Sequence, residues 1–358
     1  MSHLFRELLQ KVGSGAHTNK ALTRAEAATA LELMWTQQAT PAQIGAFLIA
    51  HRIRRPTSEE LAGMLDTYKR FGPQLAPIAA DYPVLVFGVP YDGRSRTAPL
   101  APLTALVLAA AGCPVVQHGA EMMPTKYGLS LVAVWDLLGV NWRDRSLAEI
   151  QQILQTTGIG FVYVPRLFPL ATTLTPYREQ IGKRPPLATL ELMWSPYSGD
   201  SRLVMGYVHP PTEGLIRGAL DLHQTPHYLL VKGLEGSLDL PRDRTAIIGS
   251  YRNTTAGSVS DRILVAARDQ GLSGTDVPLN RETLGAEMMQ IIGGNITSEL
   301  ARSIVWNSGF YLWQAGAAVD LQTGMAQAEI LLQTGQVQKQ LQNLLRSLEH
   351  STTVSGSP

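Results

Sequence analysis

A loop with a glycine at each end, Gly88-Val-Pro-Tyr-Asp-Gly93, is the segment of this chain best suited to bind an anion. It follows the apolar run Val84 to Phe87, which predicts a short β-strand, and it precedes a helical pattern. Glycines let the backbone approach a ligand closely, and free amides at a helix start attract negative charge. Arg94 and Arg96 could add charge-assisted bonds to a phosphate. An ordinary strand-to-helix turn is the competing interpretation, because two glycines are weak evidence.

A second loop, Gln117 to Gly128, carries the polar residues His118, Thr125 and Lys126. It follows another apolar run, so we expect a second strand before it. Ligands of parallel sheets bind outside the carboxyl ends of the strands, where the two loops should meet. Lys126 suits a phosphate. A single histidine near a strand end is more often a structural hydrogen-bonding residue than a catalyst, and both roles stay open for His118.

Two residues farther along the chain could contact a ligand. Arg178 could clamp a carboxylate or a phosphate, or it could form a surface ion pair with Glu179. Trp194 could stack on a ring, although tryptophan is more often a core residue.

The elements before these loops predict a small helical domain over residues 1–72. Three of its four expected helices begin with a capping box, in which a threonine hydroxyl and a side chain three residues later satisfy free amides. These pairs are Thr23 with Glu26, Thr40 with Gln43, and Thr57 with Glu60. The helix that begins after Thr40 ends in a cluster of basic residues, His51, Arg52, Arg54 and Arg55.

The remainder, residues 80–350, predicts a large α/β domain with a mainly parallel central sheet, because short apolar runs alternate with helical patterns. The strand candidates are Val84–Phe87, Pro114–Gln117, Gly160–Val164, Arg202–Tyr207, His227–Val231 and Thr245–Ile248. Two or three closing helices are expected over Leu300 to Leu348. Residues 351–358 predict a disordered tail, because they are rich in Ser, Thr and Gly.

Composition narrows the class of protein. Of the 358 residues, 45% are hydrophobic and 16% are charged, which is typical of a folded globular chain. The single cysteine, Cys113, excludes a disulfide framework. Neither a secretory signal nor a membrane-spanning run is evident, so we expect a cytoplasmic protein without a membrane partner. A net charge of +1 means that nucleic-acid binding would require a local basic patch.

The order Gly88…Asp92-Gly93, then a helix, then His118-Gly119 resembles the anthranilate phosphoribosyltransferases and the related pyrimidine nucleoside phosphorylases. The matching loops of that family read G-T-G-G-D-G and K-H-G-N. The segment Gln43-Ile-Gly-Ala-Phe-Leu48 is similar to the family's Q-I-G-A-F-L helix. The similarity covers nearly the whole chain. It implies the nucleoside phosphorylase/phosphoribosyltransferase-like fold, with helices from about 165–185 completing the N-terminal helical domain.

The resemblance also implies a set of functional residues. Arg178 matches an arginine that faces the anthranilate carboxylate in the family. The family's magnesium-binding Asp-Glu pair falls near Leu238-Asp239, with Glu235 as a substitute, so Asp239 and Glu235 are the candidate Mg²⁺ ligands. The residues implied to bind substrate and diphosphate are Gly88, Asp92, Gly93, Arg94, His118, Gly119, Lys126 and Arg178.

Several family positions have changed. Pro99-Leu-Ala-Pro102 stands where the family has N-I-S-T, Gln117 and Ala120 replace the Lys and Asn around His-Gly, and Phe168 replaces a His. Phosphoribosyl transfer depends on positioning and on neutralising the diphosphate, so each lost donor could reduce the rate about a hundredfold. We therefore expect reduced or altered activity.

Three functions remain open at this point. The first is pentosyl transfer from phosphoribosyl diphosphate, which by resemblance belongs to tryptophan biosynthesis. The second is non-enzymatic nucleic-acid binding, favoured by the motif Lys232-Gly-Leu-Glu-Gly236 and by Arg52, Arg54 and Arg55. The third is a regulator that binds a phosphorylated metabolite without turnover. The resemblance also implies a homodimer formed through the N-terminal helices, where the apolar helix Ile44 to Ile53 could form the contact.

Overall fold

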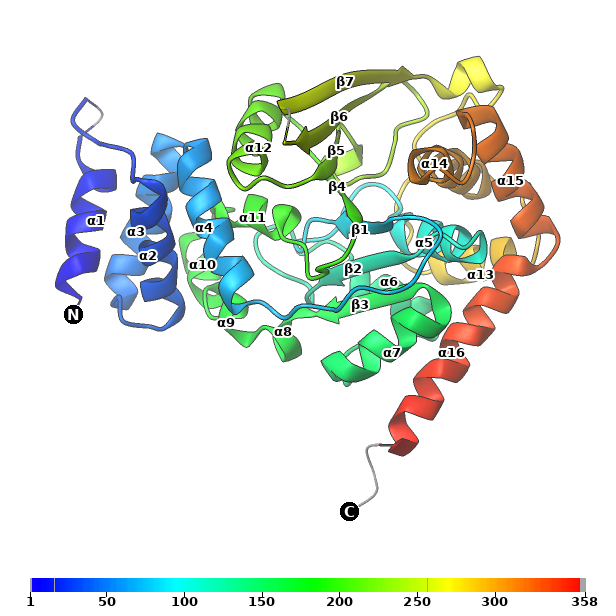
Figure 1. The fold of residues 1–358 in the computed structure, drawn as a ribbon, viewed down its shortest axis with the longest axis horizontal. Helices are drawn as coiled ribbons and strands as arrows, with labels where there is room; N and C mark the ends of the chain where they lie inside the picture. Colours follow the sequence, from blue (N-terminus) through cyan, green and yellow to red (C-terminus); the bar gives the residue numbers. More distant parts are fainter. Residues whose placement is uncertain (1, 16, 256, 355–358) are drawn as a thin grey trace.

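The computed structural model describes residues 2–15, 17–255 and 257–354, and it places a helical domain at one end of a larger α/β domain (Figure 1). The helical domain begins with α1 (His3–Gly13), α2 (Arg24–Trp35), α3 (Pro41–Arg54) and α4 (Ser58–Phe71). All three predicted capping boxes are present, at Thr23, Thr40 and Thr57. The four predicted helices and the three predicted helix starts are therefore confirmed, because short-range hydrogen bonds fix these starts.

Later segments pack onto this bundle. They are α8 (Val164–Leu167), α9 (Pro169–Thr172), α10 (Thr175–Ile181) and α11 (Leu187–Met193). Phe168, between α8 and α9, lies 5.2 Å from Trp35 and 5.4 Å from Trp194, measured between ring centroids. These segments therefore share one hydrophobic core with the first 72 residues.

The α/β domain is built on one seven-stranded sheet with the order β3-β2-β1-β4-β5-β6-β7. The first five strands in chain order are mutually parallel where they pair. The predicted mainly parallel sheet is confirmed. The strands are β1 (Val84–Gly88), β2 (Val115–Gly119), β3 (Ile159–Tyr163), β4 (Ser201–Gly206), β5 (His227–Val231), β6 (Ala246–Thr254) and β7 (Gly257–Val265).

The last two strands form an antiparallel hairpin at the edge of the sheet. The sequence predicted only Thr245–Ile248 here, so about two thirds of β6 and all of β7 were missed. Most side chains of β7 are exposed, and residues such as Ser258, Asp261 and Arg262 leave it only a short apolar run, Ile263–Val265, at its end. A strand without a buried face lacks the alternating pattern by which strands are recognised.

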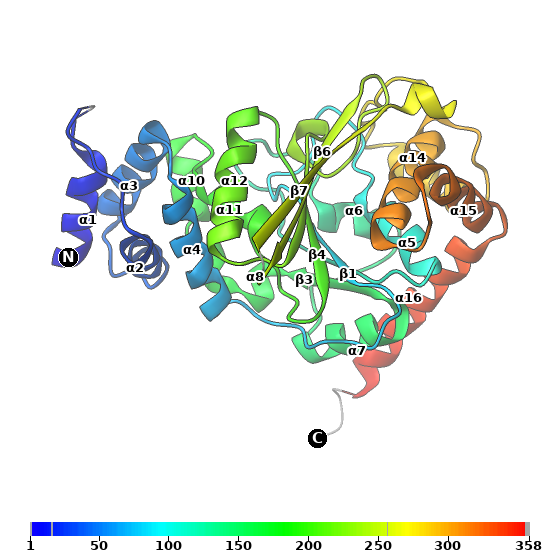
Figure 2. The same ribbon diagram turned by 45° about the horizontal axis from the view of Figure 1, so that its top comes forward.

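Helices cover both faces of the sheet (Figures 1 and 2). Leu85 and Phe87 of β1 face a core formed with the C-terminal helices, whereas Val84 and Val86 face the core shared with the helical domain. The further helices are α5 (Ala101–Ala110), α6 (Leu131–Leu137), α7 (Leu147–Thr157), α12 (Pro210–Leu222), α13 (Leu284–Ile292), α14 (Glu299–Ala315), α15 (Leu321–Gln333) and α16 (Gln336–Val354), with 3-10 turns at Leu234–Gly236 and Ala267–Gln270.

The C-terminal region contains three long helices, as predicted. The last, α16, continues to Val354 and so enters the predicted tail; residues 355–358 lie outside the described residues. Within the described part of the chain, none of the helices combines the length and the apolar character needed to cross a bilayer.

Candidate functional site

Two loops at the carboxyl edge of the sheet are joined by backbone hydrogen bonds. The amide of Gly128 donates to the carbonyl of Asp92 at 2.9 Å, and Leu129 and Arg94 exchange two bonds of 2.7 and 3.1 Å. The loop after β1 and the loop after β2 thus meet, as the parallel sheet requires. The residues of both loops predicted to bind a ligand lie around this junction.

The glycines of the first loop are needed for close packing. A Cβ atom on Gly88 would lie 2.0 Å from the carbonyl oxygen of Leu192. Gly93 has a φ of +72°, and a Cβ there would lie 2.5 Å from the carbonyl oxygen of Leu129. Both glycines therefore set the backbone geometry of the loop.

One cluster of charged side chains lies between the first loop and helices α10 and α11. Arg178 donates to Glu191 at 2.7 Å, and Arg184 lies 3.5 Å from the carboxylate of Asp92. Burial raises the pKa of Glu191, although the positive charges of Arg178 and Arg184 oppose the shift. We call Asp92, Arg178, Arg184 and Glu191 the inner cluster.

The inner cluster contains polar atoms without partners. Nε and Nη2 of Arg178, Oε2 of Glu191 and Oδ1 of Asp92 are buried and have no hydrogen-bond partner among the described residues. A cavity of about 20 Å³ lies against Arg178, Glu191 and Trp35, which is room for one water molecule. The cluster is therefore polar and unsatisfied, but closed to a larger ligand in this conformation.

His118 lies beside the inner cluster in an apolar setting. Its Nδ1 is 2.5 Å from the hydroxyl of Tyr91, and its ring is 5.1 Å from that of Trp194. Burial lowers the pKa of His118 to about 3, with the backbone of Trp194 opposing the shift. A neutral imidazole bonded to a tyrosine can orient that hydroxyl, but it supplies no positive charge to a phosphate.

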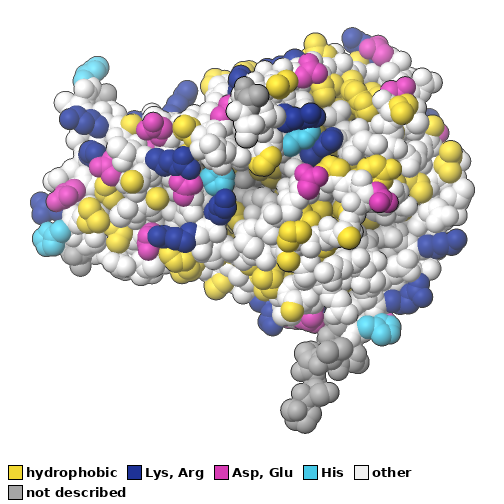
Figure 3. Space-filling model, viewed as in Figure 1, with side chains coloured by type: hydrophobic (Ala, Val, Ile, Leu, Met, Phe, Trp, Pro, Cys, Tyr) yellow, Lys and Arg dark blue, Asp and Glu magenta, His cyan; other side chains and the backbone are white. Residues whose placement is uncertain are grey.

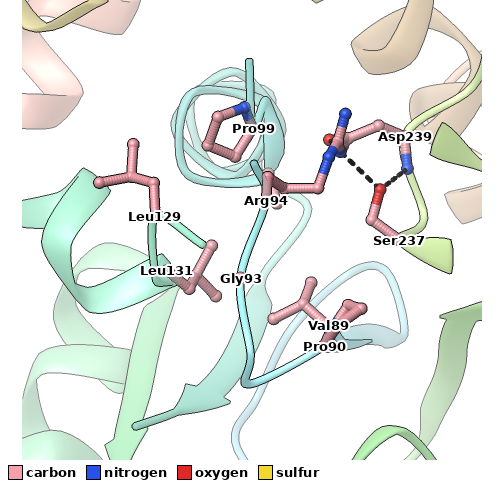
Figure 4. Close-up of a pocket in the computed structure, with 10 residues that line it drawn as sticks. Val89, Pro90, Gly93, Arg94, Pro99, Leu129, Leu131, Ser237 and Asp239 are labelled. Atoms are coloured by element: carbon pink, nitrogen blue, oxygen red, sulfur yellow. Dashed lines mark hydrogen bonds and ion pairs between the residues drawn. The ribbon is translucent and has the colours of Figure 1, made fainter. Parts of the chain in front are cut away.

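A second cluster, which we call the outer cluster, is centred on Arg94. Its guanidinium donates to Asp239 at 2.6 Å and to the hydroxyl of Ser237 at 2.7 Å, beside a narrow cavity of about 20 Å³ (Figure 4). Its Nε also donates to Glu235 at 3.3 Å. Arg94, Lys126, Glu235 and Asp239 make up this cluster, so the loops after β1, β2 and β5 all contribute to it.

Glu235 is the most extensively bonded carboxylate of the outer cluster. It accepts from the amides of Ser95, Arg96 and Thr97 at 3.2, 3.1 and 2.9 Å, and Lys126 Nζ lies 2.9 Å away. Burial alone would raise its pKa, but the bonds from Lys126, Thr97 and Ser95 outweigh burial and hold the pKa well below the usual range. Glu235 is therefore a carboxylate at all ordinary pH values.

These carboxylates do not fit a magnesium ion. Oδ2 of Asp239 accepts from Arg94 and from the amide of Leu100, which leaves only its buried Oδ1 without a partner among the described residues. Both oxygens of Glu235 accept from amides and cations. Mg²⁺ requires oxygen ligands that are free to approach at about 2.1 Å. Over the described ranges, no group of three or more His, Cys, Asp or Glu side chains could hold a metal. Arg94 and Lys126 supply the positive charge here.

A larger cavity, of about 360 Å³, lies over the second loop. Its wall includes Glu121, Met123 and Pro124 from that loop and Thr175 and Glu179 from α10. The sulfur of Met123 also lies 2.9 Å from Nη1 of Arg178. The cavity has the size of a small-molecule site, and Arg178 lies directly behind its wall.

Comparison with known proteins accounts for this arrangement. Residues 6–72 match the helical bundle domain of a glycosyl transferase family, and residues 94–338 match the a/b domain of the same family. The chain belongs to this family, in the anthranilate phosphoribosyltransferase group. The family that the sequence resembled is thereby confirmed.

The curated relatives are similar over their full length. An anthranilate phosphoribosyltransferase of Afipia carboxidovorans is 27% identical, with 95% of this chain and 98% of the relative aligned. One from Roseiflexus sp. is 29% identical, covering 90% of this chain and 93% of the relative. The chain therefore spans nearly the whole length of these two relatives.

Solved structures of family members have the same fold. The crystal structure of anthranilate phosphoribosyltransferase from Thermus thermophilus has a TM-score of 0.77 at 20% identity, covering 97% of this chain and all of that one. The Saccharomyces cerevisiae protein in complex with PRPP and Mg has a TM-score of 0.81 at 13% identity, covering 98% and 99%. At these identities the match establishes the fold alone.

Family membership makes the substituted positions informative. Gln117, at the position of a family lysine, is fully buried, and its side chain bonds to the carbonyl of Ala101 and to Trp135. Phe168, at the position of a family histidine, packs in an aromatic core. Gly119 ends β2 and packs against Phe161. Gln117 and Phe168, where the resemblance implies a lysine and a histidine, are therefore core residues in this chain.

The basic residues at the end of α3 point in different directions. Arg54 is mostly buried and pairs with Glu60, and Arg52 donates to the carbonyl of Arg184. Arg55 is exposed. Figure 3 shows lysine and arginine scattered among acidic and neutral side chains over one face of both domains. Lysine and arginine side chains form no continuous patch on the face shown.

Several residues of the site were missed from the sequence, among them Glu191, Arg184 and Ser95. Glu191 and Arg184 lie in the inner cluster, and Ser95 supplies an amide and a hydroxyl to Glu235. None belongs to a recognisable motif. Only the position of Ser95, directly after the Gly88–Arg94 loop, was a signal that could have suggested it.

Proposed function

We propose that this protein transfers a pentosyl group from phosphoribosyl diphosphate to a small acceptor that carries a carboxylate, with lower or altered activity relative to other family members. The observation that carries the proposal is the inner cluster. Arg178 is buried, and two of its guanidinium nitrogens have no partner among the described residues. A guanidinium binds a carboxylate through two parallel bonds, which would satisfy such nitrogens.

The acceptor would enter through the 360 Å³ cavity over the second loop. Met123 separates that cavity from Arg178, and methionine is a flexible side chain that can change rotamer to admit a ligand. Glu191 would then lose its position against Arg178, because two carboxylates compete for one guanidinium. This competition supports weaker acceptor binding than an unpaired arginine would give.

The donor would bind along the first loop, between the two clusters. Arg94 and Lys126 are the cations nearest to that loop, and pentosyl transfer needs positive charge beside the departing diphosphate. In this conformation Glu235 and Asp239 take up both charges. Reduced activity follows if the diphosphate must displace these internal ion pairs before it can be neutralised.

A binding assay and an activity assay together test the proposal. Phosphoribosyl diphosphate should raise the melting temperature of the purified protein in a saturable way. Loss of anthranilate fluorescence should then detect transfer, at a rate that falls further in Arg178→Gln. Binding without transfer to any of several aromatic carboxylates would favour a metabolite-binding regulator, and absence of binding at millimolar concentration would overturn the proposal.

A further inference from the structure

The carboxylate of Glu235 is surrounded by more hydrogen-bond donors than its two oxygens can bind separately. Seven donor groups lie within 3.3 Å of its two oxygens. They are the amides of Ser95, Arg96 and Thr97, the hydroxyls of Ser95 and Thr97, Nε of Arg94 and Nζ of Lys126. A carboxylate offers about four lone-pair positions, so several of these donors share one position.

A phosphate group matches this donor set better. Its three terminal oxygens are strong acceptors, and consecutive backbone amides with arginine and lysine are the usual groups that bind it. Ser95 and Arg96 are exposed and Lys126 is partly exposed, whereas the carboxylate of Glu235 is only 3% exposed. Solvent can therefore reach the rim of the cradle, but its centre is filled.

The backbone of Glu235 also favours this arrangement. Its φ is +53° and its ψ is +24°, the left-handed conformation that glycine adopts most easily. A glutamate held in this conformation costs conformational free energy. The hydrogen bonds from residues 95–97 to its carboxylate offset this cost. The main chain of the 3-10 turn does not itself require a glutamate at this position.

We propose that residues 94–97 and Lys126 form a phosphate-binding cradle that Glu235 closes from within as an internal phosphate mimic. The cradle takes a tetrahedral oxyanion, either inorganic phosphate or the phosphoryl group of a larger ligand, and the anion binds only when Glu235 moves out. This inference deepens the proposed function, on which it rests for the assignment of the cradle to the donor side of the site.

The test measures inorganic phosphate binding by isothermal titration and by melting temperature in Glu235→Gly. Glycine suits the left-handed backbone, and its introduction empties the cradle. Phosphate should bind this variant at least about tenfold more tightly than the wild type and more tightly than acetate, which has only two oxygens. The gain should disappear in Glu235→Gly combined with Lys126→Ala.

Two controls separate the cradle from other effects. Gln224 also has a positive φ, of 55°, so Gln224→Gly reproduces the backbone change away from the site and should leave phosphate binding at the wild-type level. Glu235→Gln keeps the side-chain size and removes its charge, and it should show an intermediate gain if Glu235→Gly does not fold. Equal phosphate affinity in wild type, Glu235→Gln and Glu235→Gly would overturn the inference.

The same variants distinguish this inference from the proposed function. Tighter phosphate binding by Glu235→Gly, without pentosyl transfer in any variant, would support the phosphate-binding cradle and contradict the proposed transferase activity. Pentosyl transfer by the wild type, with no increase in phosphate affinity in the variants, would support the proposed transferase activity and contradict the phosphate-binding cradle.

Discussion

The guanidinium of Arg94 lies 2.6 Å from the carboxylate of Asp239, although 145 positions separate the two residues in the chain. Both side chains are almost fully buried, and burial raises the pKa of Asp239 while Arg94 opposes the shift. The pair holds the loop after β1 against the loop after β5. The guanidinium of Arg94 thus supplies the positive charge that neutralises Asp239, a role that a metal ion could otherwise have.

Replacing Arg94 tests how strongly this pair holds the site together. Arg94→Met leaves Asp239 and Glu235 buried with fewer partners, so the free energy of unfolding should fall by about 3–5 kcal/mol. Urea denaturation measures the change. Arg96→Met is the matched control, because the Arg96 side chain is 79% exposed, and it should change stability by less than about 0.5 kcal/mol. Equal effects of the two substitutions would show that the Arg94 pairs are not stabilising.

Magnesium alone should not bind this site. Because Arg94 and Lys126 already neutralise Asp239 and Glu235, millimolar Mg²⁺ should leave the melting temperature unchanged, and chelator should do the same. A magnesium-dependent rise in the wild type that disappears in Asp239→Asn would contradict this expectation.

Removing the charge of Glu191 should expose Arg178 to ligands. In Glu191→Gln no carboxylate competes for the guanidinium, so benzoate should bind about tenfold more tightly than to the wild type in isothermal titration. Glu59→Gln, which changes an exposed carboxylate at the start of α4 outside this site, should have no effect. Benzoate binding that persists when Arg178→Gln is added to Glu191→Gln would place the carboxylate elsewhere.

Glu60 should make the stability of the helical domain depend on pH. Burial alone would raise its pKa, but the nearby imidazole of His51, whose Nε2 lies 3.6 Å from the carboxylate, and the bond from Arg54 outweigh burial and lower the pKa to about 2 from 4.5. Because the pKa of Glu60 is lower in the folded state than in the unfolded state, its ionised form stabilises the folded protein at pH values above about 4.5. This contribution, about 3 kcal/mol, is lost as the pH falls from about 4.5 to 2. Unfolding measured at several pH values should show a shallower acid loss in Glu60→Gln, and identical profiles would contradict the assignment.

The N-terminal helices should mediate the proposed homodimer. Ile53, at the end of α3, is 76% exposed, and Leu4 of α1 is 50% exposed. Ile53→Asp should therefore shift the mass measured by light scattering at micromolar concentration from dimer to monomer. Val319→Asp changes an equally exposed residue of the α/β domain and should leave the mass unchanged. A monomeric wild type would refute the dimer itself.

Local sequence was sufficient for much of the fold. The capping boxes at Thr23, Thr40 and Thr57 join residues three positions apart, so any chain with these pairs can form them without distant partners. The apolar runs of β1 to β5 predicted buried parallel strands for a similar reason. The hairpin strand β7 was missed, because its pairing with β6 and not its own hydrophobicity makes it a strand.

The sequence by itself determined the family, the two domains and the meeting of the first two loops at the edge of the sheet. Only the tertiary structure decided what Glu235 and Asp239 bind. The sequence does not indicate whether a carboxylate is neutralised by a metal or by an arginine. Arg94, which pairs with both Glu235 and Asp239, lies about 140 positions before them in the chain. The same holds for Arg178 and Glu191, since a buried ion pair depends on packing that no short motif records.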